Sequence, residues 1–137
     1  MISLLKKLID SKSIDGYIIP KNDEFFSEYS FPNRLKFISN FSGSAGMAII
    51  LKDINFLFVD GRYTEQASIE SGNNFKIFEI PKTRPFNILK KRKDKLKLGF
   101  DPKLFTETSL KSNFRDSCNL IPISNNLIDE ILNLKNN

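Results

Sequence analysis

Two short stretches of this sequence combine residue types that could bind a ligand. The first is a loop of small residues, Phe41-Ser42-Gly43-Ser44-Ala45-Gly46. Its glycines would let backbone N–H groups approach a ligand closely, and its serines add hydroxyl donors. The second is a charged corner, Asp60-Gly61-Arg62-Tyr63. Its guanidinium could bind a peptide carboxylate through two parallel hydrogen bonds. We therefore expect function at these two places.

Each stretch also has a purely structural interpretation. The loop could be a tight turn that leads into a buried strand. Asp60 is expected to accept hydrogen bonds from the free N–H groups of the helix that follows it. Arg62 could pair with Asp60 or Glu65 and fix the corner. Tyr63 is expected to be a packing residue with its hydroxyl hydrogen-bonded, and Arg34 is expected to stabilise the connection between a helix and the loop.

The sequence contains no histidine, which excludes Ser-His and Cys-His nucleophiles and imidazole-based zinc sites. The acidic residues are scattered singly, apart from the adjacent pairs Asp23-Glu24 and Asp129-Glu130. Adjacent side chains on a helix or strand point apart, so we predict that each pair is solvated at the surface. Cys118 is the single cysteine, and we predict a small buried hydrophobe rather than a nucleophile. These residues predict neither a catalytic group nor a metal site.

Length and composition predict one globular domain. The chain has 137 residues, 40% of them hydrophobic, with thirteen phenylalanines, which is enough for one core over residues 1–137. The net charge of +5 would permit a polyanionic partner, but the lysines are spread along the whole chain. No apolar run approaches the ~18 residues of a membrane span, and the start lacks the pattern of a signal peptide. We expect a cytoplasmic protein with no membrane partner.

A basic run from Lys90 to Lys97 follows a segment in which Pro85 is expected to start a helix. One interpretation is an anion-binding patch. The other is that these lysines lie near a helix carboxyl end and in a turn, where they favour the helix dipole and are otherwise solvated. The sequence favours the second interpretation and leaves the first open.

Hydrophobic periodicity predicts the elements that hold these stretches. Helices are expected at 2–10, from Pro32 through Ile38, at 64–71 with Gly72 after it, from Pro85 into the basic run, from Thr106 to about Asp116, and at 127–134. Strands are expected at 16–20, 47–51, 56–59, 75–80, 96–100 and 119–123, with 22–31 irregular or briefly helical. The second and third strands form a hairpin at the centre of the sheet. The fold class is therefore an α/β sandwich with a mixed sheet of about six strands and helices on both faces.

Several short motifs occur in order along the chain: Ser27-Glu28-Tyr29, Arg34-Leu35 with Phe37-Ile38, Phe41 to Gly46, Val59 to Tyr63 with Gln66-Ala67, Leu98 to Pro102, and Asn126 to Leu132. In order and spacing they resemble the amino-terminal domain of aminopeptidase P, the Xaa-Pro aminopeptidase branch of the creatinase/prolidase group. The resemblance covers nearly the entire chain and implies the ribonuclease H-like fold of that domain.

The resemblance also implies what the chain does not contain. Members of this M24 peptidase family remove the amino-terminal residue that precedes proline, using two divalent metals, commonly manganese. Those metals lie in a carboxy-terminal pita-bread domain, which is absent here, so no cofactor is expected in this chain. The resemblance implies a noncatalytic domain that helps the enzyme to dimerise and forms part of the substrate cleft. Its expected partners are the catalytic domain of the same polypeptide, a second copy of the enzyme and proline-containing peptides.

In creatine-cleaving relatives, the loop similar to Phe41–Gly46 reaches the partner subunit's active site. This sequence lacks an arginine there, so a carboxylate-clamping role does not carry over. The candidates for the cleft are Phe41, Ser42, Ser44, Arg62 and Tyr63, and those for the structural motif are Arg34, Gly43, Gly46, Asp60 and Gly61. Two alternatives stay open: a stand-alone binding or scaffold domain without a catalytic partner, and a basic nucleic-acid-binding domain.

Overall fold

The fold is built on one mixed six-stranded sheet. A computed structural model describes residues 1–22 and 33–135 of the chain. The strand order is β4-β3-β2-β1-β5-β6. The strands are β1 (Gly16–Pro20), β2 (Gly46–Leu51), β3 (Asn55–Asp60), β4 (Lys76–Ile80), β5 (Lys97–Phe100) and β6 (Asn119–Pro122). The predicted fold class, an α/β sandwich with a mixed sheet of about six strands, is confirmed.

The direction of the strands decides which loops meet. β2 runs antiparallel to both β1 and β3, whereas β1 pairs parallel with β5, β3 with β4, and β5 with β6. Five strands therefore end at one edge of the sheet, which we call the carboxyl edge, and β2 begins there. The other edge, where those five strands begin, is the amino edge.

The apolar runs form the buried strands that the sequence predicts. β1 is buried along its whole length, and β2 and β3 are buried at most positions, as expected for strands covered on two faces. The turn between β2 and β3 closes with a hydrogen bond from the Leu51 N–H to the Ile54 carbonyl, 3.0 Å long. One detail of the prediction is wrong: β1, and not β3, shares the centre of the sheet with β2.

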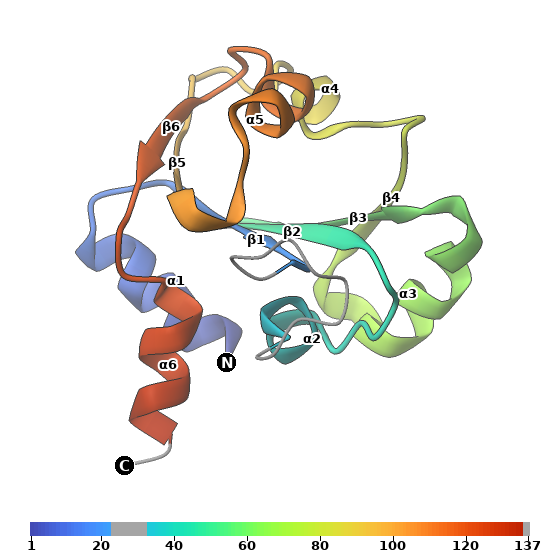
Figure 1. The fold of residues 1–137 in the computed structure, drawn as a ribbon, viewed down its shortest axis with the longest axis horizontal. Helices are drawn as coiled ribbons and strands as arrows, with labels where there is room; N and C mark the ends of the chain where they lie inside the picture. The colour runs from blue at the N-terminus through green and yellow to red at the C-terminus, as the bar shows by residue number, and fades with distance from the viewer. Residues whose placement is uncertain (23–32, 136–137) are drawn as a thin grey trace.

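Helices cover both faces of the sheet (Figure 1). One apolar cluster lies on the face of α1 (Ile2–Ser11), α2 (Arg34–Ser39), α3 (Thr64–Ser71) and α6 (Leu127–Lys135). A second cluster lies on the opposite face, where the helices that the structure describes are α4 (Pro85–Leu89) and α5 (Glu107–Phe114). Within the described part of the chain, no helix is both long and apolar enough to cross a membrane.

Several helix boundaries follow from their capping residues. α2 begins at Arg34, since the Asn33 side chain accepts from the Lys36 N–H, and it ends at Ser39, because Asn40 has a left-handed φ of 65°. α5 begins after Thr106, close to the predicted start, because the Thr106 hydroxyl accepts from the Ser109 N–H. The predicted start at Pro32 and the prediction for 23–31 lie outside the described residues.

Other boundaries differ from the prediction. α4 ends at Leu89, so the basic run forms a turn rather than the last turn of a helix. α5 ends at Phe114, two residues earlier than expected, because Arg115 has a left-handed φ of 40°. α3 ends at Ser71 and is followed by Gly72 at φ 63°, as predicted.

Candidate functional site

The loop and the charged corner meet at the carboxyl edge of the sheet. The loop leads into β2 and the corner follows β3, and Gly46 lies opposite Val59 in the antiparallel register. In open α/β sheets, ligands bind beyond the carboxyl ends of the strands. The two stretches that the sequence singled out therefore form one surface in the position where this class of fold places its ligands.

Tyr63 joins the two stretches. Its hydroxyl shares a 3.0 Å hydrogen bond with the Ser44 hydroxyl, and its ring meets the Phe41 ring edge-on, with centroids 6.0 Å apart. This confirms that Tyr63 is a packing residue with its hydroxyl bonded. Phe41 is fully buried, so its ring packs between the loop and the core and is not accessible to a ligand.

Gly43 lets the loop fold over that ring. A Cβ atom added at Gly43 would overlap the ring of Phe41. One added at Gly46 would lie 3.1 to 3.3 Å from Leu35, Phe41 and the Phe58 carbonyl. Close packing of the loop against the buried ring of Phe41 therefore favours glycine at position 43, whereas a side chain at position 46 would need its neighbours to shift by a few tenths of an ångström.

Glu70 on α3 holds the other end of the loop. Its carboxylate accepts from the backbone N–H of Ser42 at 2.9 Å and from the Ser42 hydroxyl at 2.8 Å. Gln66, one helical turn earlier, donates to the Ser42 hydroxyl and to Glu70. The Ser42 N–H, followed by the Ser42 hydroxyl and Gln66, lowers the pKa of the Glu70 carboxyl. The sequence analysis did not single out Glu70; the available signal was the four-residue spacing of two polar side chains on α3.

Arg62 and Asp60 fix the charged corner. The Asp60 carboxylate accepts from the Arg62 N–H at 2.9 Å and from Arg62 Nε at 3.1 Å. These contacts lower the pKa of Asp60 and raise that of Arg62. Asp60 therefore caps the short 3₁₀ turn Gly61–Tyr63, as predicted. Arg62 pairs with Asp60, which is the first of the two structural partners that the sequence suggested for it.

Arg62 nevertheless stays accessible. Its side chain is 74% exposed, and its guanidinium lies 5.2 Å from the centroid of the Tyr63 ring. Among the described residues, no hydrogen bond or ion pair engages its two terminal nitrogens. A guanidinium held at its Nε side, with its terminal nitrogens facing solvent, can donate to a carboxylate or carbonyl oxygen.

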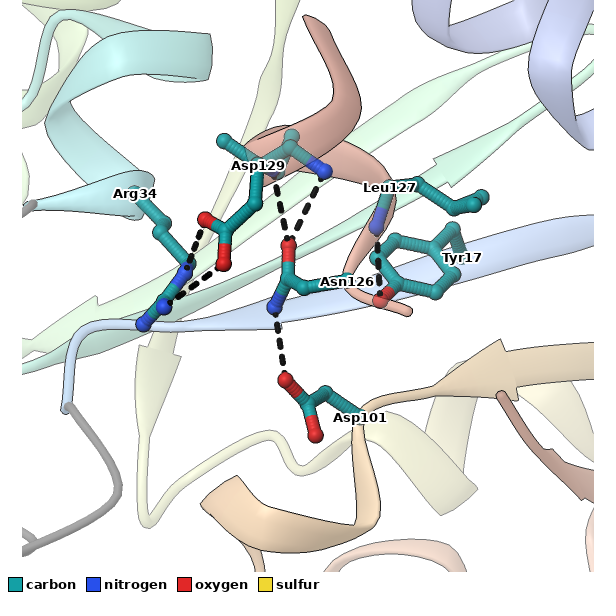
Figure 2. Close-up of polar contacts among 7 residues, drawn as sticks. Tyr17, Arg34, Asp101, Asn126, Leu127 and Asp129 are labelled. Atoms are coloured by element: carbon teal, nitrogen blue, oxygen red, sulfur yellow. Dashed lines mark hydrogen bonds and ion pairs between the residues drawn. The ribbon is translucent and has the colours of Figure 1, made fainter. Parts of the chain in front are cut away.

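Arg34 makes a different contact from the predicted one (Figure 2). Its Nε and Nη2 donate to the two carboxylate oxygens of Asp129 on α6, at 2.8 and 3.0 Å. Its side chain is 12% exposed, and the hydrogen bonds to Asp129 raise its pKa. Two predictions are therefore wrong: Arg34 does not fix the helix-to-loop connection, and Asp129 is not simply solvated. The physical reason is that the first turn of α6 returns against α2.

Polar side chains around this ion pair tie α6 to the sheet (Figure 2). Asn126 accepts from the N–H groups of Ile128 and Asp129, and donates to the buried carboxylate of Asp101 at 3.0 Å. The Tyr17 hydroxyl, from β1, accepts from the Leu127 N–H at 3.3 Å. Burial raises the pKa of Tyr17. Arg34 Nη1 is buried and has no hydrogen-bond partner among the described residues, whereas Tyr17, Asp101, Asn126 and Asp129 each have a partner within the fold. The cluster therefore connects α6 to α2 and to the sheet beside the candidate site.

Among the residues that the structure describes, no group of three or more Cys, Asp and Glu side chains could hold a metal ion. Cys118 is buried, as predicted, and burial raises the pKa of its thiol to about 11. Asp23 and Glu24 lie outside the described residues.

Comparisons with known proteins agree with this geometry. The family model of the creatinase/prolidase N-terminal domain matches residues 1–131. A probable Xaa-Pro aminopeptidase P from Pyricularia oryzae is 35% identical over 137 residues, covering 91% of this chain and 22% of that protein.

Solved structures show the same fold. The X-prolyl aminopeptidase of Caenorhabditis elegans, described as a cytosolic enzyme with a di-nuclear active site, is 26% identical. It aligns with a TM-score of 0.84 over 96% of this chain and 25% of that one. The N-terminal domain of the peptidase PepQ from Mycobacterium tuberculosis is 20% identical and aligns with a TM-score of 0.73, covering 95% of this chain and 96% of that one.

The chain thus spans only about a fifth of the curated relatives it matches. The family model nevertheless extends over almost all of its 137 residues, and the observed sheet, loop and corner are those on which the sequence resemblance rests. The chain belongs to the creatinase/prolidase N-terminal domain family.

Proposed function

We propose that residues 1–137 form one noncatalytic domain of a metal-dependent Xaa-Pro aminopeptidase, which contributes to dimerisation and to the wall of the substrate cleft. The observation that carries the proposal is the family match over residues 1–131, combined with relatives named Xaa-Pro aminopeptidase P in which this region is 22% of the length. The remaining length of such a relative has room for a catalytic domain.

The carboxyl edge is the part of the domain that would face the substrate. Arg62 is the main candidate, because its guanidinium is exposed and already fixed at one side by Asp60. Ser42 and Ser44 would contribute through the loop that Glu70 and Tyr63 hold in place. Preorganised donors lose little entropy when a peptide binds. We therefore propose that Arg62 binds a carboxylate or carbonyl oxygen of the proline-containing peptide.

The catalytic chemistry would belong to the partner domain of the same polypeptide. Two divalent metals, commonly manganese in this family, would be held there and none by this chain. The dinuclear active site and cytosolic location given for the related C. elegans enzyme support this assignment and a cytoplasmic location.

The proposal is tested by Arg62→Ala in an enzyme in which this chain is joined to a catalytic domain. The expected result is a rise in KM for an Xaa-Pro peptide of roughly tenfold, the usual cost of losing one charge-assisted hydrogen bond, with little change in kcat. Lys111→Ala is the matched control, since it removes one exposed cation from α5. Unchanged KM in Arg62→Ala, or an equal change in both variants, would remove Arg62 from the cleft.

A further inference from the structure

A second concave surface lies at the amino edge of the sheet, opposite the candidate site. It is lined by the turn between β2 and β3, the first half of β4 and the turn that follows α4, and its volume is about 620 Å³. We call this surface the basic groove. It uses none of the residues of the loop or the charged corner, so it is separate from the surface assigned to the proposed function.

The floor of the basic groove is apolar. It consists of Phe56, Phe78, Ile54 and Ile88. The two phenylalanine rings lie 5.7 Å apart between centroids. Phe56 is 4% exposed, whereas the other three side chains are half-buried. These residues belong to the second apolar cluster or pack against it, on the face where the described helices are α4 and α5, five and eight residues long.

The rim of the basic groove is positively charged. Lys76, Lys91, Arg92 and Lys93 line it, together with a single carboxylate, that of Asp53. Both oxygens of Asp53 accept from Arg92 Nη2, at 3.1 and 3.0 Å, so this carboxylate is already neutralised. Within the described ranges, no carboxylate pairs with any of the three lysines. The three lysines that line the groove therefore have no carboxylate partner among the described residues, and the Lys76 ammonium lies 5.6 Å from the centroid of the Phe78 ring.

The basic groove continues along the amino edge. A neighbouring hollow of about 470 Å³ shares Asp53, Ile54 and Lys76 with it, and adds Lys6 and the polar side chain of Asn73. The Lys6 ammonium donates to the Lys52 carbonyl at 3.3 Å and adds a further positive charge. The continuous surface suits an extended segment better than a single small anion.

We propose that the basic groove binds an acidic polypeptide segment carrying a large apolar side chain. The apolar floor would bury that side chain, and the lysines would meet the carboxylates on either side of it. A nucleic acid fits less well, because only a few ammonium groups are available and the Phe56 ring is covered rather than presented for base stacking. Under this proposal, part of the basic run Lys90 to Lys97 binds anions, which is the interpretation of that run that the sequence alone did not exclude.

The test uses the purified chain and a short fluorescein-labelled peptide in which glutamates flank a central phenylalanine. We expect saturable binding by fluorescence anisotropy that weakens as salt rises. Replacing the phenylalanine by serine, or the glutamates by glutamines, should weaken binding by roughly tenfold in each case. No saturable binding of the first peptide, or equal binding of all three, would overturn the proposal.

Two double variants distinguish peptide binding in the groove from nonspecific electrostatic attraction to a basic protein. Lys91→Glu with Lys93→Glu should weaken binding by at least roughly tenfold. Lys7→Glu with Lys103→Glu makes the same change in net charge at exposed positions outside the groove and should change affinity less than about threefold. Equal losses in the two pairs would overturn the proposal. So would tighter binding of a single-stranded oligonucleotide that depends on Lys91 and Lys93. Circular dichroism of both pairs confirms that each remains folded.

Discussion

The guanidinium of Arg34 on α2 donates to both carboxylate oxygens of Asp129 on α6, although the two residues are 95 positions apart in the sequence. Asp129 lies in the first turn of α6, where a carboxylate also favours the helix dipole. α2 leads directly into the loop at the carboxyl edge. The pair therefore connects the terminal helix to the element that precedes the candidate site.

Breaking this pair should destabilise the fold. Arg34→Ala removes a bidentate contact in which the arginine side chain is 12% exposed and the aspartate side chain 40%, and we expect a loss of about 1.5–3 kcal/mol in the free energy of unfolding, measured by urea denaturation. Lys111→Ala is the control, because it breaks an exposed pair with Glu107 one helical turn away. Lys111→Ala should lower the free energy of unfolding by no more than about 0.5 kcal/mol.

A double-mutant cycle between Arg34→Ala and Asp129→Asn isolates the contact itself. The two single changes should be markedly non-additive, with a coupling energy of at least about 1 kcal/mol. A coupling energy near zero would mean that the pair contributes nothing specific.

Protonation of Glu70 should release the loop. Its pKa in the folded protein lies below the ordinary value of 4.5, chiefly because the Ser42 N–H donates to the carboxylate. A lowered pKa means that its contribution to stability is present above about pH 4.5 and is lost as the pH falls through the folded value. Glu70→Gln should therefore be less stable than the wild type at about pH 7, and the difference should shrink at lower pH. The urea midpoints of both proteins test this; an equal difference at about pH 3 and about pH 7 would contradict it.

Cys118 should react slowly while the protein is folded. Its thiol is 5% exposed, and burial raises its pKa to about 11, so the reactive thiolate is scarce at neutral pH. We expect labelling by Ellman's reagent to be slow in buffer and fast in concentrated urea. Equal rates in both solutions would show that the second apolar cluster opens readily around this residue.

Gly43 should not tolerate a side chain. Gly43→Ala would place its Cβ atom against the buried ring of Phe41. We expect the free energy of unfolding to fall by about 1–3 kcal/mol, the usual cost of overpacking a core. Ala45→Ser is the matched control, because Ala45 in the same loop is exposed and should change stability by less than about 0.5 kcal/mol. Similar melting temperatures for the two variants would show that the loop moves away from Phe41 at little cost.

The sequence predicted the features that depend on local patterns. The apolar runs indicated β2 and β3 and the hairpin that they form, and the register of that hairpin places the loop beside the charged corner. The caps at Asp60 and Thr106 likewise follow from neighbouring residues. In contrast, the contacts of Arg34 with Asp129 and of Glu70 with Ser42 depend on how helices pack. A single sequence shows that these side chains are polar, but not which distant partner each one meets.

Hydrolysis of an Xaa-Pro peptide is the measurement that tests the central claim most directly. The purified 137-residue chain would be assayed with added manganese, beside the product expressed with whatever coding sequence follows residue 137. The proposed role as a noncatalytic domain predicts hydrolysis only by the longer product. Manganese-dependent hydrolysis by the 137 residues alone would contradict it and would require an active site built from this chain's own carboxylates.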